Sequence, residues 1–319
     1  MFFILFFNSV ILYSFCYNIT IKGENMEIIK ITPQGFCLGV IKAIQIINKA
    51  LEDPNLQKPI YMYGGLVHNK HIINAYKEKG VIIVDDIFNI YKGTIVITAH
   101  GVSDEIINLI KERNLGLINT TCKYVYKTHN LIKEKLSEGY EIIFFGKKTH
   151  PETKGVLGID SRINLIESIN DIDNLNIDSK NIVFTTQTTM SYIEVEEIIE
   201  KLIKKYPFIK TFEDVCSATK SRQMALINQA KDSDLCIVVG DPKSNNTNKL
   251  KEVCLKYTNA FCIMIENVED LKNFDFSKYQ KISVTAGAST PPKIVDEVIN
   301  GIKNNQFNSK LKSDDYLKF

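Results

Sequence analysis

Short apolar runs alternate along the chain with longer segments in which apolar residues recur every three or four positions. The short runs have the length of buried strands, and the longer segments have the periodicity of amphipathic helices. This alternation predicts an α/β fold in which mainly parallel sheets are covered by helices. The predicted strands are 60–63, 81–84, 94–98, 141–145, 182–185, 235–239, 261–265 and 282–285.

The same pattern occurs three times, each time after a cysteine. Cys37, Cys122 and Cys216 stand at nearly even intervals, and each precedes a helical segment. A strand ending in glycine and a polar loop follows, and then a second strand that ends in a polar turn. Such a degenerate repeat predicts three pseudo-equivalent lobes. The expected parts are an N-terminal extension 1–25, lobes 26–118, 119–211 and 212–304, and a C-terminal tail 305–319.

The polar turns that end these strands carry residues suited to an anion. A ligand of a parallel sheet lies beyond the carboxyl ends of the strands, so three lobes facing one centre would bring three thiols and six polar turns to one cavity. Most side chains there donate hydrogen bonds and the turns open helices, which favours a diphosphate. Each Ser, Thr or Asn could equally be an ordinary helix N-cap. The residues are His68, His100, His150, Thr188, Ser244, Asn246 and Ser289.

Three thiols at one point suggest a metal centre. The choice lies between zinc and an iron–sulfur cluster, although neither shows its usual local pattern because no two of these cysteines are close in sequence. Packing without a metal is the third possibility. The remaining cysteines and histidines are interpreted as structural or exposed: Cys236, Cys254 and Cys262 in the core, His71 and His129 in helices, and Cys16 in the N-terminal extension.

One acidic residue, Glu152, follows His150 and Pro151 in a loop that would face the same centre. A carboxylic acid at this place could deliver a proton to a leaving hydroxyl. It could also be a first-turn acid of a helix, which the helix dipole favours.

Composition narrows the class of protein. The chain has 319 residues, of which 45% are apolar and 24% charged, as is ordinary for a globular protein of two or three compact units. A net charge of +2 argues against nucleic acid or an anionic membrane as the main partner. Seven cysteines without close pairs favour reduced thiols or metal ligands, so a cytoplasmic location is expected.

Residues 2–17 are almost entirely apolar, but they are fewer than the ~20 residues that span a bilayer. A positive n-region and a small-residue cleavage site, which mark a signal peptide, are not evident. We interpret residues 1–25 as an upstream extension, with Met26 as the working start and no stable membrane association. A targeting or anchoring segment is the alternative.

Taken together, the motifs resemble one enzyme family, the 4-hydroxy-3-methylbut-2-enyl diphosphate reductases of the non-mevalonate isoprenoid pathway. The similarity runs from about residue 27 to 303, with the motifs in the family's order. At Asn245 the family often has serine, so a contact there could be made through the backbone. The motifs are 35–40 (GFCLGV), 67–69 (VHN), 99–103 (AHGVS), 120–122 (TTC), 150–152 (HPE), 186–189 (TQTT), 216–219 (CSAT), 244–247 (SNNT) and 285–289 (TAGAS).

The resemblance implies a three-lobed fold around one 4Fe-4S cluster per chain, held by Cys37, Cys122 and Cys216. It implies that the substrate's hydroxyl binds the open iron and that Glu152 donates a proton, with Thr188 helping to relay or orient it. Two electrons and two protons then yield isopentenyl or dimethylallyl diphosphate and water. A small ferredoxin or flavodoxin is the implied electron donor. The implied diphosphate ligands are His68, His100, His150, Thr188, Ser244, Asn245, Asn246 and Ser289.

Two other classes of protein remain open from the residues alone. One is a non-redox phosphate-binding protein or zinc hydrolase, in which the cysteines bind zinc or merely pack. The other is a catalytically inactive paralogue that acts as a binding module, although all three cysteines and Glu152 are present.

Overall fold

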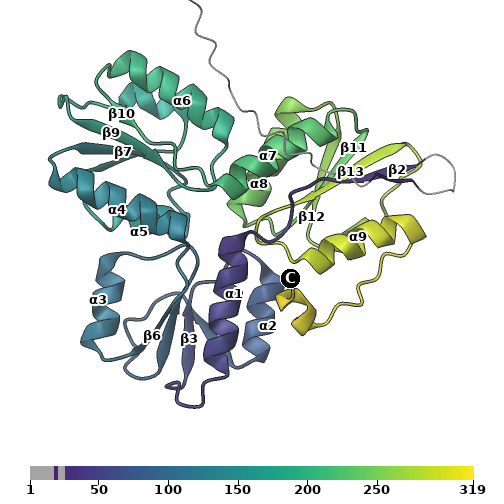
Figure 1. Ribbon diagram of the computed structural model, residues 1–319, viewed down its shortest axis with the longest axis horizontal. Coiled ribbons are helices and arrows are strands. Elements are labelled where there is room, and N and C mark those ends of the chain that lie inside the picture. The colour runs from purple at the N-terminus through teal and green to yellow at the C-terminus, as the bar shows by residue number, and fades with distance from the viewer. Residues whose placement is uncertain (1–17, 21–25) are drawn as a thin grey trace, which may run out of the picture.

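The computed structural model describes residues 18–20 and 26–319 and arranges them as three lobes around a common centre (Figure 1). Each lobe contains one sheet with helices packed on it. Parallel strands that are covered on both faces consist of continuous apolar runs, so these strands could be predicted from the sequence. The predicted α/β fold is confirmed, and every predicted strand is present to within one residue at each end.

The first lobe has a four-stranded parallel sheet in the order β4-β3-β5-β6. Helix α1 packs on it through one apolar face that includes Val40, Ile44 and Ile47. The elements are α1 (Leu38–Leu51), β3 (Ile60–Tyr63), α2 (Lys70–Glu78), β4 (Val81–Val84), β5 (Thr94–Ile97), α3 (Asp104–Glu112) and β6 (Gly116–Asn119).

The second lobe repeats this arrangement with a parallel sheet in the order β10-β9-β7-β8. Phe145 and Phe184, on neighbouring central strands, are fully buried in its core. The elements are α4 (Lys123–Ser137), β7 (Glu141–Phe145), α5 (Pro151–Leu157), β8 (Ile163–Ile166), the 3₁₀ helix η1 (Ile169–Asn174), β9 (Ile182–Thr186), α6 (Tyr192–Lys205) and β10 (Lys210–Thr211).

The third lobe has a five-stranded sheet in the order β1-β2-β13-β11-β12. All neighbours are parallel except β1, which pairs antiparallel with β2. The elements are β1 (Asn18–Thr20), β2 (Glu27–Lys30), α7 (Ser217–Ala230), β11 (Leu235–Val239), α8 (Asn245–Tyr257), β12 (Phe261–Ile265), η2 (Val268–Leu271), β13 (Lys281–Ala286) and α9 (Pro292–Asn304).

The first lobe was predicted to begin at residue 26, but it begins later in the structure. Strand β2 pairs with β13, with Ile28 opposite Ile282, so this segment belongs to the sheet of the third lobe and the chain enters the first lobe only at α1. This difference was not predictable, because the pairing of two strands so far apart in the sequence leaves no local pattern. Of the predicted extension 1–25, residues 1–17 and 21–25 lie outside the described residues.

The C-terminal tail crosses in the opposite direction, from the third lobe back to the first. Its last helical turn, η3 (Ser313–Leu317), packs on α2. Leu317 enters the hydrophobic core of the first lobe, and Asp314 pairs with Lys79 at 2.7 Å. Figure 1 accordingly places the C-terminus beside α1 and α2. Both ends of the fold therefore tie the first lobe to the third.

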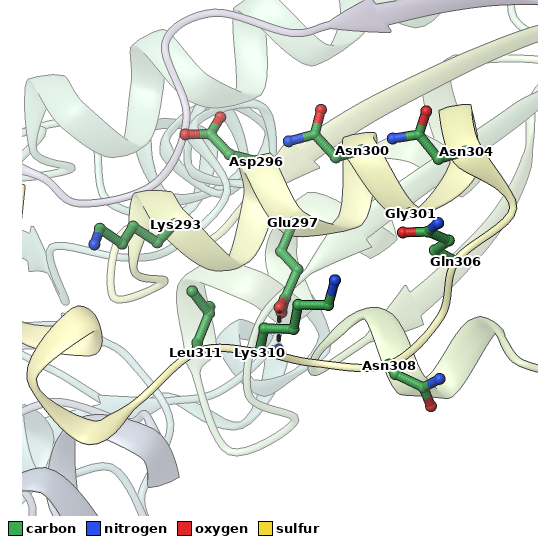
Figure 2. A pocket seen from close by; sticks show the side chains of 10 residues that line it. All are labelled: Lys293, Asp296, Glu297, Asn300, Gly301, Asn304, Gln306, Asn308, Lys310 and Leu311. Atoms are coloured by element: carbon green, nitrogen blue, oxygen red, sulfur yellow. Dashed lines mark hydrogen bonds between the residues drawn. The ribbon is translucent and has the colours of Figure 1, made fainter.

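Figure 2 shows how the tail begins beneath α9. The chain turns back at Asn305, whose backbone is left-handed with φ 52°. The carboxylate of Glu297 then accepts the Lys310 backbone N–H at 2.7 Å and the Ser309 hydroxyl at 2.8 Å. The polar groove between helix and tail has a volume of about 320 Å³ and is lined by none of the predicted site residues.

No helix formed by the described residues is both long enough and apolar enough to cross a bilayer.

Candidate active site

All the residues predicted for the site line one cavity of about 90 Å³, and its lining residues come from all three lobes. Each lobe contributes polar side chains that follow its strands, as expected for a ligand beyond the carboxyl ends of parallel strands. The predicted residues in the lining are Cys37, His68, His100, Cys122, His150, Glu152, Thr188, Cys216, Ser244, Asn245, Asn246 and Ser289.

The three cysteines hold equivalent places. Cys37, Cys122 and Cys216 are the N-cap residues of α1, α4 and α7, and each has an extended backbone. None of their thiols caps its helix, and all three are free and partly exposed. The thiols are therefore available to a shared ligand at the ends of three helices, where the helix dipole favours negative charge.

Gly39 marks the space between the thiols. A Cβ atom at this position would lie 3.0 Å from the Cys122 Sγ and 3.7 Å from the Cys37 Sγ. Burial raises the pKa of the Cys122 and Cys216 thiols, and neighbouring thiols raise it further, so thiolates gathered here need a bound cation. Three soft ligands, a gap kept by glycine and no fourth cysteine in the described lining fit a metal centre with an open coordination position.

His68, His100 and His150 form a tight cluster, with ring centroids 4.6 to 5.2 Å apart. Burial lowers the pKa of all three, to about 3 for His150, so the rings are neutral and each offers one N–H donor. Their ring nitrogens lie within 4.8 Å of one another. This spacing suits three donors to one phosphate group, and it also suits three ligands to one metal ion.

Two of these rings each have a nitrogen that is available to bind a ligand. The Nε2 of His68 is buried and has no hydrogen-bond partner among the described residues. The Nδ1 of His150 accepts the backbone N–H of Glu152 at 3.2 Å, which places the ring proton on Nε2. Buried polar atoms without partners are uncommon, so this His68 nitrogen is a candidate donor or acceptor to a ligand.

Glu152 lies in the first turn of α5, behind Pro151, and is only 1% exposed. Its carboxylate accepts two hydrogen bonds from Thr188, from the backbone N–H at 2.8 Å and from the hydroxyl at 3.0 Å. Burial raises the pKa of Glu152 to about 7 against the lowering effect of these two bonds, and the charge of Asp214 adds to the rise. A carboxyl group with this pKa can hold a proton at neutral pH and release it.

The third lobe contributes hydroxyl and amide groups from the turn before α8 and the turn after β13. Ser244 caps α8 by accepting the Thr247 N–H at 3.3 Å, and the Ser289 hydroxyl donates to the His68 carbonyl at 3.1 Å. The Ser289 contact joins the third lobe to the first beside the histidine cluster. Ser244 thus plays the capping role considered as its alternative, while its side chain also lines the cavity.

Asn245 and Asn246 differ in what their side chains do. The Asn245 amide nitrogen donates to both the carbonyl and the hydroxyl of Thr189 at 3.0 Å, and so joins the third lobe to the second. Its Oδ1 is buried without a partner among the described residues. Asn246 bridges Thr219 and Ala288, with contacts of 3.2 and 2.9 Å.

Thr219 and Thr189 also line this cavity and were not predicted as site residues. Thr219 lies 3.2 Å from the Cys216 Sγ through its hydroxyl, and Thr189 receives the Asn245 amide. A Thr three positions after an N-cap cysteine faces the same side of the helix, so the spacing in Cys-Ser-Ala-Thr was a usable signal. Thr189 had no such signal, because its contact depends on how two lobes meet.

The residues interpreted as structural lie outside the cavity lining. Cys236, Cys254 and Cys262 are buried in the core of the third lobe, as predicted. His129 is buried in α4, and His71 packs against Tyr316 with ring centroids 4.6 Å apart.

Comparisons with known proteins show which family the chain belongs to. The family model described as LytB protein matches residues 28–303. The 4-hydroxy-3-methylbut-2-enyl diphosphate reductase of Geobacillus sp. (strain WCH70) is 46% identical over 282 residues, which cover 86% of this chain and 90% of that protein. The protein of the same name from Anoxybacillus flavithermus is 44% identical, with the same two coverages.

Solved structures give the same result for the fold. The structure of the E-1-hydroxy-2-methyl-but-2-enyl-4-diphosphate reductase from Plasmodium falciparum matches with a TM-score of 0.83 and 33% identity, covering 89% of this chain and 90% of that one. With a family model spanning most of the chain and relatives above 40% identity, the chain belongs to the LytB protein family.

Proposed function

We infer that this chain is a 4-hydroxy-3-methylbut-2-enyl diphosphate reductase. The reaction removes the substrate's hydroxyl as water with two electrons and two protons, and it yields isopentenyl or dimethylallyl diphosphate. The observation that carries this inference is the single cavity in which three cysteines, three histidines and the Glu152–Thr188 pair meet. The relatives that share most of the chain's length are named for this activity.

The cysteines Cys37, Cys122 and Cys216 would hold one 4Fe-4S cluster per chain. When bound, such a cluster supplies single electrons and a Lewis-acidic iron that has no protein ligand. The gap beside Gly39 and the absence of a fourth cysteine from the described lining support this assignment. The electrons would come from a small ferredoxin or flavodoxin, in a cytoplasmic location.

The histidines would bind the substrate's diphosphate. Neutral His68, His100 and His150 direct N–H donors to one small region, and the negative charge of a bound diphosphate would raise their pKa values toward protonation. Hydroxyl and amide groups would complete the diphosphate site. These are provided by Thr188, Ser244, Asn245, Asn246 and Ser289. Because each lobe supplies ligands, diphosphate binding would also hold the three lobes together.

Glu152 would deliver the proton to the leaving hydroxyl. The two hydrogen bonds from Thr188 hold its carboxyl group in one orientation beside the cavity. Burial both raises its pKa to about 7 and excludes bulk water from the reacting groups. Thr188 would therefore position the acid, and its hydroxyl would relay a proton to it.

One observation favours a second candidate, a zinc-dependent hydrolase. The three histidine nitrogens can hold a metal ion, as zinc enzymes with three histidine ligands do. That function leaves the three converging thiols without a role, which is why we favour the reductase.

Metal analysis separates the two candidates. We expect anaerobically purified protein to be brown and to carry about four irons per chain, the content of one cubane cluster. Replacing Cys37, Cys122 or Cys216 by Ser should abolish the cluster. Cys236→Ser is the matched control and should keep it, because that thiol is buried in the sheet of the third lobe. Colourless protein with stoichiometric zinc would overturn the reductase.

A further inference from the structure

One buried charge beside the cavity has no part in the mechanism above. Arg222, in α7, is 4% exposed. All the partners of its guanidinium among the described residues are backbone carbonyls, and none is a carboxylate. A buried guanidinium without a counter-ion is unfavourable, so its presence calls for a nearby source of negative charge.

The guanidinium joins the two chain segments that carry Cys37 and Cys216. Its Nη2 donates to the carbonyls of Gly35 at 2.8 Å and Phe36 at 3.2 Å, immediately before Cys37. Its Nη1 donates to the carbonyl of Ala218 at 2.8 Å, in the helical turn that follows Cys216. One side chain therefore links the turn that enters the first lobe to a helix of the third.

Cysteines that hold a metal centre are thiolates, and they would supply the negative charge that the carboxylates do not. Burial lowers the pKa of Arg222, and the Cys37 and Cys216 thiolates act in the opposite direction. The Nε of Arg222 is also buried without a partner among the described residues. The side chain is thus a fixed cation bound to the backbone beside two of the three cysteines, with no carboxylate partner among the described residues.

We propose that Arg222 is a positioning residue and the fixed counter-charge of the three-cysteine centre. Its hydrogen bonds hold Cys37 and Cys216 at the separation that a shared centre needs. Its charge favours the reduced form of the centre, because an added electron is stabilised by a buried cation in a medium of low dielectric constant. The proposal rests on the proposed function, since it requires a redox-active centre on these thiols.

The test compares two substitutions of Arg222 with a matched arginine elsewhere. Arg222→Gln removes the charge, and Arg222→Lys keeps the charge but cannot reproduce the three hydrogen bonds. Arg113 is the control because its guanidinium also binds two backbone carbonyls, those of Ile87 and Ile90, at 2.9 and 3.0 Å. The measurements are the midpoint potential of the centre, by mediated titration with dithionite, and the rate of iron release to a chelator.

We expect Arg222→Gln to lower the midpoint potential and Arg222→Lys to keep it near the wild-type value. Both variants should release iron roughly tenfold faster or more, as expected for lost charge-assisted hydrogen bonds. Arg113→Gln should change neither quantity. If Arg222→Gln assembles no centre, the test relies on Arg222→Lys. A midpoint potential well below the wild-type value in Arg222→Lys would then overturn the proposal that Arg222 is the counter-charge.

The two possible failures are distinguishable. Wild-type protein without iron would overturn the proposed function and this inference together. Wild-type protein that contains the cluster, with unchanged potential and unchanged iron release in both Arg222 variants, would overturn only the inference.

Discussion

The carboxyl group of Glu152 offers the sharpest test of the proposed chemistry. Glu152→Gln keeps the size of the side chain and one oxygen to accept the hydrogen bonds of Thr188, but it removes the titratable proton. Substrate should still bind, because the diphosphate ligands are untouched. Turnover should fall by on the order of 10² or more, which is the usual contribution of general acid catalysis.

The size of the pH effect follows from the pKa of about 7. The acid form is half populated at pH 7 and about one tenth populated at pH 8, so wild-type turnover should fall about fivefold between these pH values. The same pKa lies above the ordinary 4.5, which corresponds to about 3 kcal/mol in favour of the neutral acid in the folded protein. The stability that this group contributes is therefore present below pH 4.5 and is lost as the pH rises through 7.

The assay is turnover with an artificial reductant across pH 6 to about 9, together with substrate affinity from spectral shifts of the cluster. Glu167→Gln is the control, because this exposed acid of the same lobe accepts only the Lys148 backbone N–H at 2.7 Å. If Glu152→Gln turns over normally, or keeps the wild-type fall above pH 7, the proton comes from another group. Unfolding of apo protein gives a second check: the variant should gain stability over wild type between pH 4.5 and 7.

Two further predictions concern binding and cluster assembly. His68→Ala removes a hydrogen-bond donor to the substrate's diphosphate, whose charge hardly changes during the reaction. Substrate affinity should therefore weaken by roughly 1 to 3 kcal/mol while turnover at saturation changes little. A loss of turnover without a loss of affinity, measured with the same assay, would contradict this role. Gly39→Ala places a Cβ atom 3.0 Å from the Cys122 Sγ and 3.7 Å from the Cys37 Sγ. We expect lower iron content with unchanged thermal unfolding of the apo protein, and normal iron content would show that the gap is not needed.

The central strands were predictable because their burial on both faces leaves continuous apolar runs. Five strands of the described residues were not predicted, and all of them lie at or beside sheet edges: β1, β2, β6, β8 and β10. Burial is partial along β2, β6, β8 and β10. Leu117 in β6 is 39% exposed, for example, and the four-residue strand also contains Gly116 and Asn119. Partial exposure removes the pattern by which a strand is recognised.

The candidate site was predictable to the extent that it repeats. Cysteines before helices and polar turns after strands recur in each lobe, and their convergence follows from the geometry of parallel sheets. Contacts between lobes do not repeat. The hydrogen bonds from Asn245 to Thr189 and from Arg222 to Phe36 could therefore not be predicted from the repeated pattern. The pKa of Glu152 also depends on its burial in the folded chain, which the sequence pattern does not show.

The pairing of β2 with β13 has a consequence for how the protein is made. β2 leaves the ribosome before the strands of the first and second lobes, and β13 leaves after them. The second lobe can complete its sheet from one continuous stretch of chain, whereas the sheet of the third lobe cannot close until β13 has been made. A stalled or truncated chain therefore exposes the free edge of β2, which is a template for aggregation. The cavity shared by the three lobes can be completed only after β13 and the turn with Ser289 have been made.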